Sequence, residues 1–129
     1  MEFTKNELQI MSLLWSENRP MTKTEILALS LDKTWKDNSF HIIMNSLISS
    51  GAVAIAGFEQ TGKRIGRTYV AEYTFEQHLA RQVKSVVKER KTNIGKIVAA
   101  LYHDVEIDSK TIQELEKIVE NMRMELKEK

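Results

Sequence analysis

The sequence predicts a mainly α-helical chain with one small β-hairpin, and three observations support this fold class. Apolar residues recur at helical spacing in six separate segments. Residues 52–73 break that period and alternate as strands do. Helix-start signals of the Thr-x-x-Glu or Thr-x-x-Gln kind occur at residues 4, 22 and 74. We therefore expect three helices, a hairpin and three further helices.

Composition excludes several classes of protein. The chain has 129 residues, 42% of them hydrophobic and 29% charged, which is typical of a soluble globular protein. It contains no apolar run long enough to span a bilayer, and its N-terminus lacks a signal segment, so we expect a cytoplasmic protein with no membrane partner. The absence of cysteine excludes disulfides and thiolate metal sites.

Charge is unevenly distributed along the chain, although the net charge is only +1. Residues 60–100 hold nine Lys or Arg and three Asp or Glu, a balance of +6, whereas residues 1–59 and 101–129 are mildly acidic. A localised basic segment is the electrostatic footprint of a nucleic-acid-binding protein. A basic patch without a partner is the common alternative.

The first two helices are expected to follow capping boxes at Thr4–Glu7 and Thr22–Glu25. The first helix is apolar nearly all round and is expected to pack on more than one side, through Leu8, Ile10, Met11, Leu13, Leu14 and Trp15. Residues 16–20, which include the only proline, end it. The second helix is shorter and carries Ile26, Leu27, Leu29 and Leu31.

The third helix, within residues 35–51, has two contrasting faces. Its apolar stripe is Phe40, Ile43, Met44, Leu47 and Ile48. The opposite face is almost free of carboxylates and consists of Asn38, Ser39, His41, Ile42, Asn45, Ser46 and Ser49. Such side chains suit the reading of base edges, where Asn pairs with adenine and an aliphatic group meets the thymine methyl. A merely polar surface helix is the alternative. Gly51 is expected to end the helix in the left-handed region.

The hairpin is expected to have strands at residues 52–58 and 67–73 and a basic tip at residues 59–66. Three helices followed by a basic-tipped hairpin is the order of a winged helix-turn-helix domain, whose third helix enters the major groove. We expect this domain to span residues 1–74. Its candidate DNA contacts are Lys36, Asn38, Ser39, His41, Ile42, Asn45, Ser46, Ser49, Lys63, Arg64 and Arg67.

Residues 75–129 are expected to form three amphipathic helices, the second and third capped by Asn93 and Asp108. So short a segment buries little apolar surface alone, so its stripes imply a second copy of the chain and a helical dimerisation region. The stripes comprise Leu79, Val83, Val87, Ile94, Ile97, Val98, Leu101, Ile112, Leu115, Ile118, Val119 and Met122. Folding back onto the N-terminal half is the alternative.

An enzyme is not expected. His41, His78 and His103 lie on three different predicted helices, and none belongs to a metal-binding or nucleophile motif. The alternate carboxylates Asp104, Glu106 and Asp108 fit a helix cap and a solvated turn better than a catalytic cluster. No catalytic residue, metal site or cofactor is therefore predicted.

Three stretches resemble the penicillinase-repressor family, also called BlaI/MecI/CopY. Residues 34–53, T-W-K-D-N-S-F-H-I-I-M-N-S-L-I-S-S-G-A-V, are similar to its third-helix segment. Residues 7–15, E-L-Q-I-M-S-L-L-W, resemble its first helix, and residues 66–70, G-R-T-Y-V, its wing strand. The resemblance implies a dimeric winged-helix repressor that binds double-stranded DNA with two inverted half-sites. It also implies a sensor or protease as the partner that relieves repression.

The sequence departs from the family pattern in four places. Ser46 stands where the family usually has a basic residue, and the wing is longer and carries Lys63 and Arg64, so phosphate contacts are expected to have moved to the wing. No Cys-x-Cys pair supports a copper response, and residues 98–101, V-A-A-L, replace the cleavable Asn-Phe bond. Because the third helix presents no Arg, a winged-helix module that binds a protein of a transcription complex remains the alternative function.

Overall fold

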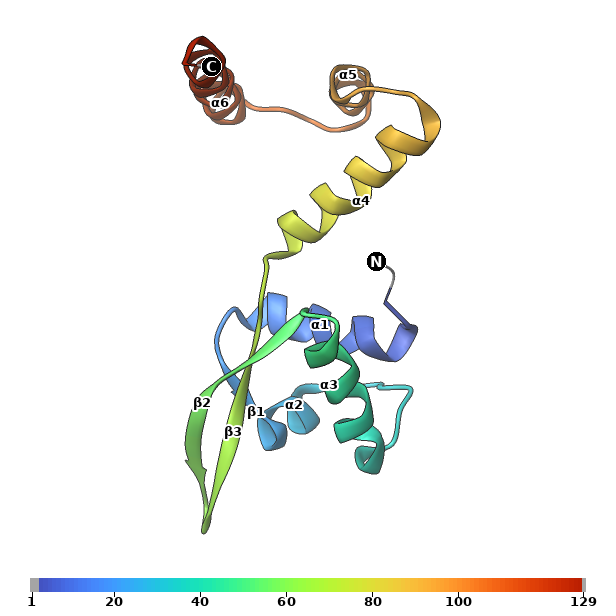
Figure 1. Cartoon of the computed structure of the whole chain (residues 1–129), viewed down its shortest axis with the longest axis vertical. Coiled ribbons are helices and arrows are strands. Elements are labelled where there is room, and N and C mark those ends of the chain that lie inside the picture. The colour runs from blue at the N-terminus through green and yellow to red at the C-terminus, as the bar shows by residue number, and fades with distance from the viewer. Residues whose placement is uncertain (1–2, 129) are drawn as a thin grey trace. The chain divides into compact units, whose positions relative to one another are not determined.

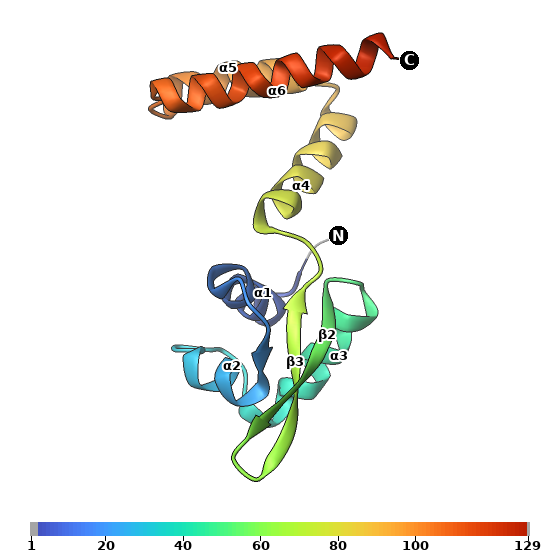
Figure 2. The same ribbon diagram turned by 90° about the vertical axis from the view of Figure 1, so that its left-hand side faces the viewer.

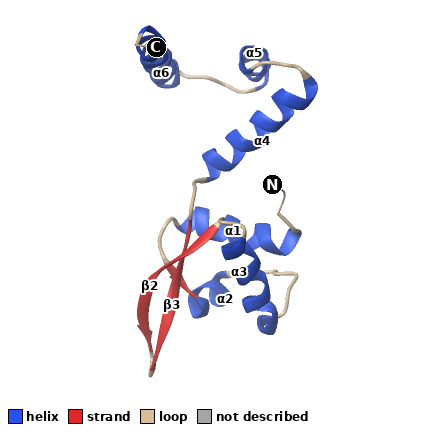
Figure 3. Ribbon diagram, viewed as in Figure 1, coloured by secondary structure: helices blue, strands red, loops and turns tan. Residues whose placement is uncertain are grey.

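Six α-helices and a small antiparallel sheet make up the computed structural model, which describes residues 3–128 and has the predicted fold class (Figures 1 and 3). The elements are α1 (Lys5–Glu17), β1 (Met21–Thr22), α2 (Lys23–Leu29), a 3₁₀ turn η1 (Asp37–Ser39), α3 (Phe40–Ser49), β2 (Val53–Thr61), β3 (Arg64–Ala71), α4 (Phe75–Arg90), α5 (Ile94–Asp104) and α6 (Ser109–Lys127). The chain divides into two compact units, Met1–Lys84 and Ser85–Lys129.

The core of the first unit forms where the three N-terminal helices meet the sheet. The predicted α3 stripe is confirmed, since Phe40, Ile43, Met44 and Leu47 are buried and Ile48 is half-buried. They pack with Ile10, Met11 and Leu14 of α1, Ile26 of α2 and Tyr69 of β3. Each of these large side chains contributes about 1.5–3 kcal/mol on burial, and truncation of Phe40 to Ala would cost about 3–5 kcal/mol.

The first helix packs on more than one side, as its sequence predicts. Ile10, Met11 and Leu14 are buried, and Leu13 and Trp15 are half-buried against the same core. Leu8 is the one residue of the predicted apolar set that is exposed. In α2 only Ile26 is buried. The helix ends at Leu29, and Leu31 lies in the following turn, where it is exposed to solvent.

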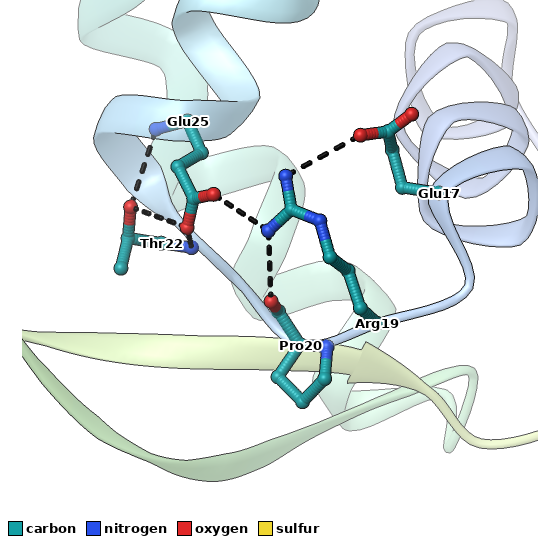
Figure 4. Close-up of polar contacts among 5 residues, drawn as sticks. All are labelled: Glu17, Arg19, Pro20, Thr22 and Glu25. Atoms are coloured by element: carbon teal, nitrogen blue, oxygen red, sulfur yellow. Dashed lines mark hydrogen bonds and ion pairs between the residues drawn. The ribbon is translucent and has the colours of Figure 1, made fainter.

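All three predicted capping boxes, at Thr4, Thr22 and Thr74, are present. The Thr22 amide donates to Glu25 Oε1 at 3.1 Å, and the Glu25 amide donates to Thr22 Oγ1 at 3.2 Å. Figure 4 shows that Arg19 extends this cluster, with Nη1 at 2.6 Å from Glu25 Oε2 and Nη2 at 3.3 Å from Glu17 Oε1. The hydrogen bond from the Thr22 amide, together with Arg19, lowers the pKa of Glu25. The start of α2 is thus fixed by several polar contacts.

The sheet has the order β1-β3-β2, and its first strand was not predicted from the sequence. Met21 and Thr22 pair with Tyr69 and Thr68 of β3, which ties the start of α2 to the hairpin. The hairpin itself differs from its expected form. Its strands continue to Thr61 and Arg64, so the connection is only two residues long and the expected eight-residue tip is wrong.

The turn that connects β2 and β3 explains why both strands continue to the tip of the hairpin. Gly62 has a φ of 64°, and Lys63, the other connecting residue, is not in the left-handed region. This pattern matches a type II′ turn, whose twist suits the flanking strands and needs glycine at its first central position. The result is a long two-stranded ribbon, here called the wing (Val53–Ala71), whose tip extends past the helices of its unit in both views (Figures 1 and 2).

The first half of α4 belongs with the winged-helix unit. His78 is buried and stacks on Trp15, with ring centroids 5.0 Å apart, while Trp15 Nε1 donates to the Tyr73 carbonyl at 2.9 Å. The expected domain boundary after residue 74 falls at the start of this helix, whereas the compact units meet after Lys84. Residue 1, where the first expected domain begins, and residue 129, where the second ends, lie outside the described residues.

The second unit consists of the end of α4 with α5 and α6. Asn93 and Asp108 cap α5 and α6 as predicted, each accepting a hydrogen bond from the third amide of its helix. The bond from the Thr111 amide lowers the pKa of Asp108. No side chain of α5 or α6 is buried. Along the described chain, none of the helices combines the length and apolarity that crossing a membrane requires.

Candidate nucleic-acid interface

The outward face of α3 carries the polar side chains that the sequence singled out. His41, Ile42, Asn45, Ser46 and Ser49 are exposed, because the helix turns its other side into the core. Ile42 is 74% exposed, although it is one of the two isoleucines that open the helix. An exposed aliphatic group among hydrogen-bonding side chains offers both kinds of contact that a major groove requires.

The segment just before α3 forms a 3₁₀ turn and not an α-helix. Asn38 and Ser39 lie in η1, a 3₁₀ turn that Lys36 precedes in extended conformation. Asn38 and Lys36 are exposed, and Ser39 is half-buried. These three candidate contacts therefore lie just ahead of α3 and not on it.

A hollow of about 460 Å³ joins α3 to two other elements of the unit. His41 and Asn45 line it from α3, Lys23 and Thr24 from α2, and Arg67 from β3. Residues separated by more than 40 positions thus surround one space, and two of them, Lys23 and Arg67, are cations. The structure brings Arg67 of the wing together with the two middle residues of the α3 face.

Lys23 lies in the candidate interface beside His41, although the sequence analysis did not predict it. Its Nζ lies 3.4 Å from His41 Nε2 and 5.6 Å from the centre of the Phe40 ring. No local signal in the sequence indicated this, because the proximity of Lys23 to His41 depends on how α2 packs beside α3.

Ser46, like His41, contacts another side chain of the protein. Its Oγ donates to Glu7 Oε2 at 2.9 Å, and Glu7 also accepts the Thr4 amide at 2.8 Å. Partial burial acts to raise the pKa of Glu7, but the hydrogen bonds from Thr4 and Ser46 prevail and lower it. A carboxylate therefore lies beside Ser46, where the family usually has a basic residue, and this position is poorly suited to a phosphate.

The wing holds the remaining basic candidates. Lys63 lies in the two-residue turn, Arg64 begins β3, and both are exposed, as is Arg67. Within residues 3–128 none of these three cations forms an ion pair with a carboxylate. Their charge is therefore not neutralised by the described protein and is available to an anionic partner.

The candidate dimerisation residues lie on α4, α5 and α6 and are mostly solvent-exposed. Those at least 41% exposed are Leu79, Ile94, Val98, Leu101, Ile112, Leu115, Ile118, Val119 and Met122. Val83, Val87 and Ile97 are half-buried. Exposed apolar stripes of this extent are typical of interaction sites.

Two features of the described chain bear on other functions. No group of three or more His, Asp or Glu side chains among residues 3–128 is arranged to hold a metal ion. His78 is buried in an aromatic cluster with Trp15 and Phe75, so its ring serves packing. His41 alone of the three histidines lines the hollow described above.

Three short helices, a two-stranded wing and an exposed polar face on the third helix define a winged helix-turn-helix protein of the DNA-binding kind. The family model described as penicillinase repressor matches residues 3–121, nearly the whole chain. The chain therefore belongs to the penicillinase repressor family, as its motifs suggested. Family and fold together indicate a DNA-binding transcriptional repressor. Comparison with curated proteins gave no significant match.

Proposed function

We propose that this chain is a sequence-specific repressor that binds, as a homodimer, an operator made of two inverted half-sites. The observation that carries the proposal is the hollow in which Asn45 and His41 of α3 meet Lys23 of α2 and Arg67 of β3. Groups that read bases and groups that neutralise phosphates thereby lie on one continuous surface.

Base reading is assigned to the exposed face of α3. Asn45 lies in the middle of the helix, and its amide can bond an adenine edge through two hydrogen bonds. Ile42 is one residue after His41, and its exposed side chain suits the methyl group of thymine. These contacts require α3 to enter the major groove, as the third helix of such domains does.

Phosphate binding is assigned to the basic residues around this face. Lys23 lies beside His41, and Lys63, Arg64 and Arg67 occupy the wing. Contacts of this kind position the protein and carry no sequence information directly. Affinity should fall with salt, with a slope of about −0.9 per phosphate neutralised.

Dimerisation is assigned to the second unit. The helices α5 and α6 are amphipathic, yet none of their side chains is buried within the described chain. A second copy packed against these stripes would remove the exposed leucine, isoleucine and valine side chains from water, which is the main driving force for association. A twofold-symmetric dimer presents two α3 helices about 34 Å apart, which matches successive major grooves.

Relief of repression by a sensor or protease is part of the proposal. Residues 98–101, which replace the family's cleavable bond, lie inside α5. A protease needs an extended segment, so local unfolding of α5 would have to precede cleavage there. Relief through a different position or a different signal is equally compatible with the proposed dimer.

A protein-binding role in a transcription complex is the second candidate. It is favoured by one observation, that no Lys or Arg lies on the exposed face of α3. Selection of bound sequences from random duplex DNA separates the two functions. Enrichment of an inverted repeat is expected, and enrichment of no sequence would overturn the DNA-reading proposal in favour of the protein-binding one.

A further inference from the structure

A second hollow in the first unit lies apart from the proposed DNA interface. Its volume is about 660 Å³, and its lining lies within residues 12–19 and 70–76, which are the second half of α1 with the turn after it and the segment from the end of β3 to the first turn of α4. None of these residues lines the hollow beside α3. Protein pockets that bind small molecules commonly have volumes of about 300–1,000 Å³. This hollow, here called the α1–α4 cavity, therefore has the size of a ligand site.

Aromatic side chains line part of the α1–α4 cavity. Trp15 and Phe75 both line it, and the centroids of their rings are 5.3 Å apart. Phe75 is 45% exposed, so a large apolar ring is left uncovered at the cavity. The indole N–H of Trp15 donates to the Tyr73 carbonyl at 2.9 Å, which satisfies this donor within the protein. Trp15 therefore offers the cavity an apolar ring, as Phe75 does, and the two rings suit a ligand with an aromatic body.

The charged side chains of the lining leave an excess of negative charge. They are Arg19, Glu72 and Glu76. The Arg19 guanidinium is bound by Glu25 at 2.6 Å and by Glu17 at 3.3 Å (Figure 4), so its charge is balanced within the protein. Glu72 and Glu76 are exposed, and neither forms an ion pair within the described part of the chain. The lining is therefore complementary to a positively charged ligand.

The aromatic rings favour the same sign of charge. A cation is attracted to the face of an aromatic ring, and most strongly to that of tryptophan. This attraction already occurs next to the cavity, where the guanidinium of Arg81 lies 4.0 Å from the centre of the Tyr73 ring. Trp15 and Phe75 add two rings that line the cavity itself. Rings and unpaired carboxylates in one cavity are together the chemistry that binds an organic cation.

We propose that the α1–α4 cavity binds a small organic cation that has an aromatic body. The aromatic part packs against Trp15 and Phe75, and the charged part lies toward Glu72 and Glu76. A bound ligand then contacts both α1 and the first turn of α4 and stabilises their packing. This proposal goes beyond DNA binding and does not depend on it, because the cavity shares no lining residue with the hollow beside α3.

The test uses the full-length protein and two probes of the same shape, tetraphenylphosphonium and tetraphenylborate, which carry opposite charges. Binding is followed by NMR of the two indole N–H groups, because Trp15 lines the cavity, whereas Trp35 does not and serves as an internal control. The phosphonium should shift the Trp15 signal saturably and leave the Trp35 signal unchanged. It should bind roughly tenfold more tightly than the borate, because two carboxylates attract one probe and repel the other. No saturable shift of the Trp15 signal, or an equal or higher affinity for the borate, would overturn the proposal.

The contribution of charge is tested with paired variants. Glu72→Gln combined with Glu76→Gln should abolish the preference for the phosphonium over the borate. Glu59→Gln combined with Glu89→Gln is the matched control, because both residues are exposed, lie outside the cavity and remove the same net charge. The control should keep the preference of the wild-type protein. If both pairs of changes reduce the preference equally, only the overall charge of the protein matters and the proposal is overturned.

The contribution of the rings is tested in the same way. Phe75→Ala should weaken phosphonium binding roughly tenfold, about the effect of removing one large apolar side chain from its contact. Phe58→Ala is the matched control, because Phe58 is 70% exposed and lies on β2, outside the cavity. It should bind the phosphonium as the wild-type protein does. Thermal unfolding checks that both variants are folded. Equal weakening by the two changes would show binding to exposed apolar surface in general and would overturn the proposal.

Discussion

Replacement of Asn45 by Ala tests base reading by α3. Asn45 is exposed in the middle of the helix and forms no side-chain hydrogen bond within residues 3–128, so its amide is available to a base. Loss of one bidentate contact with adenine should cost about 1–3 kcal/mol for each half-site, roughly 5-fold to 150-fold in affinity for each half-site that the dimer contacts. Folding should not suffer, because alanine is the better helix former at an exposed position.

The assay is fluorescence anisotropy on the enriched repeat and on a set of single-base variants of it. Asn45→Ala should weaken binding to the preferred sequence and flatten the preference at one base pair in each half-site. A double-mutant cycle between Asn45 and that base pair should return a coupling of similar size. If Asn45→Ala instead lowered affinity for every sequence equally, α3 would be a docking surface and the reasoning would be refuted.

Four other outcomes follow from the structure. Changing both Lys63 and Arg64 to Ala should weaken binding to specific and random DNA alike. The slope of affinity against salt should become shallower by about 0.9 for each phosphate that the variant no longer neutralises. An altered sequence preference would contradict this prediction. Removal of residues 85–129 should leave a folded monomer with much weaker operator binding, as measured by light scattering and anisotropy; a dimer would refute the assigned interface. Thr22→Ala should cost about 0.5–2 kcal/mol in denaturant unfolding, because the cap of α2 is removed. The pKa of Glu25 is lowered below its ordinary value of 4.5. The ionised carboxylate therefore stabilises the folded state at pH values above 4.5, and this stabilisation is lost as the pH falls through the lowered pKa. Glu25→Gln should remove this part of the acid dependence of stability in thermal melts.

Local signals in the sequence were enough for much of the winged-helix unit. The spacing of Phe40, Ile43, Met44 and Leu47 predicted the buried side of α3, because a helix has only one face that such spacing can form. The capping boxes at Thr4 and Thr22 predicted two helix starts, since both partners of each hydrogen bond lie within four residues. A pattern whose residues all lie within one helix can be recognised from the sequence of that helix alone.

The features that were missed depend on residues distant in the sequence. Strand β1 has only two residues and exists because Met21 and Thr22 pair with Tyr69 and Thr68. The proximity of Lys23 to His41 depends on how α2 packs beside α3, which no local pattern records. The tip of the wing, residues 59–66, was expected as a loop, because Gly62 and Gly66 are typical turn residues, whereas only Gly62 of these two has a positive φ.

The sequence also does not show which apolar side chains are exposed to solvent. Phe58 was assigned to a strand on its β-compatible surroundings, and nothing in that pattern indicated that no helix covers it. The stripes of α5 and α6 were recognised as amphipathic, and their interpretation as a dimer interface remains a prediction. What an apolar face contacts is decided by tertiary or quaternary packing.

The central claim, a homodimer that reads two inverted half-sites with paired α3 helices, is tested most directly by changing the spacing of the half-sites. Insertion of about five base pairs, half a helical turn, moves one half-site to the opposite side of the duplex. The account predicts one dimer per duplex on the enriched repeat and a large loss of affinity after the insertion, both measurable by analytical ultracentrifugation of labelled DNA. Equal affinity for the two duplexes, or a single chain bound to each, would contradict it.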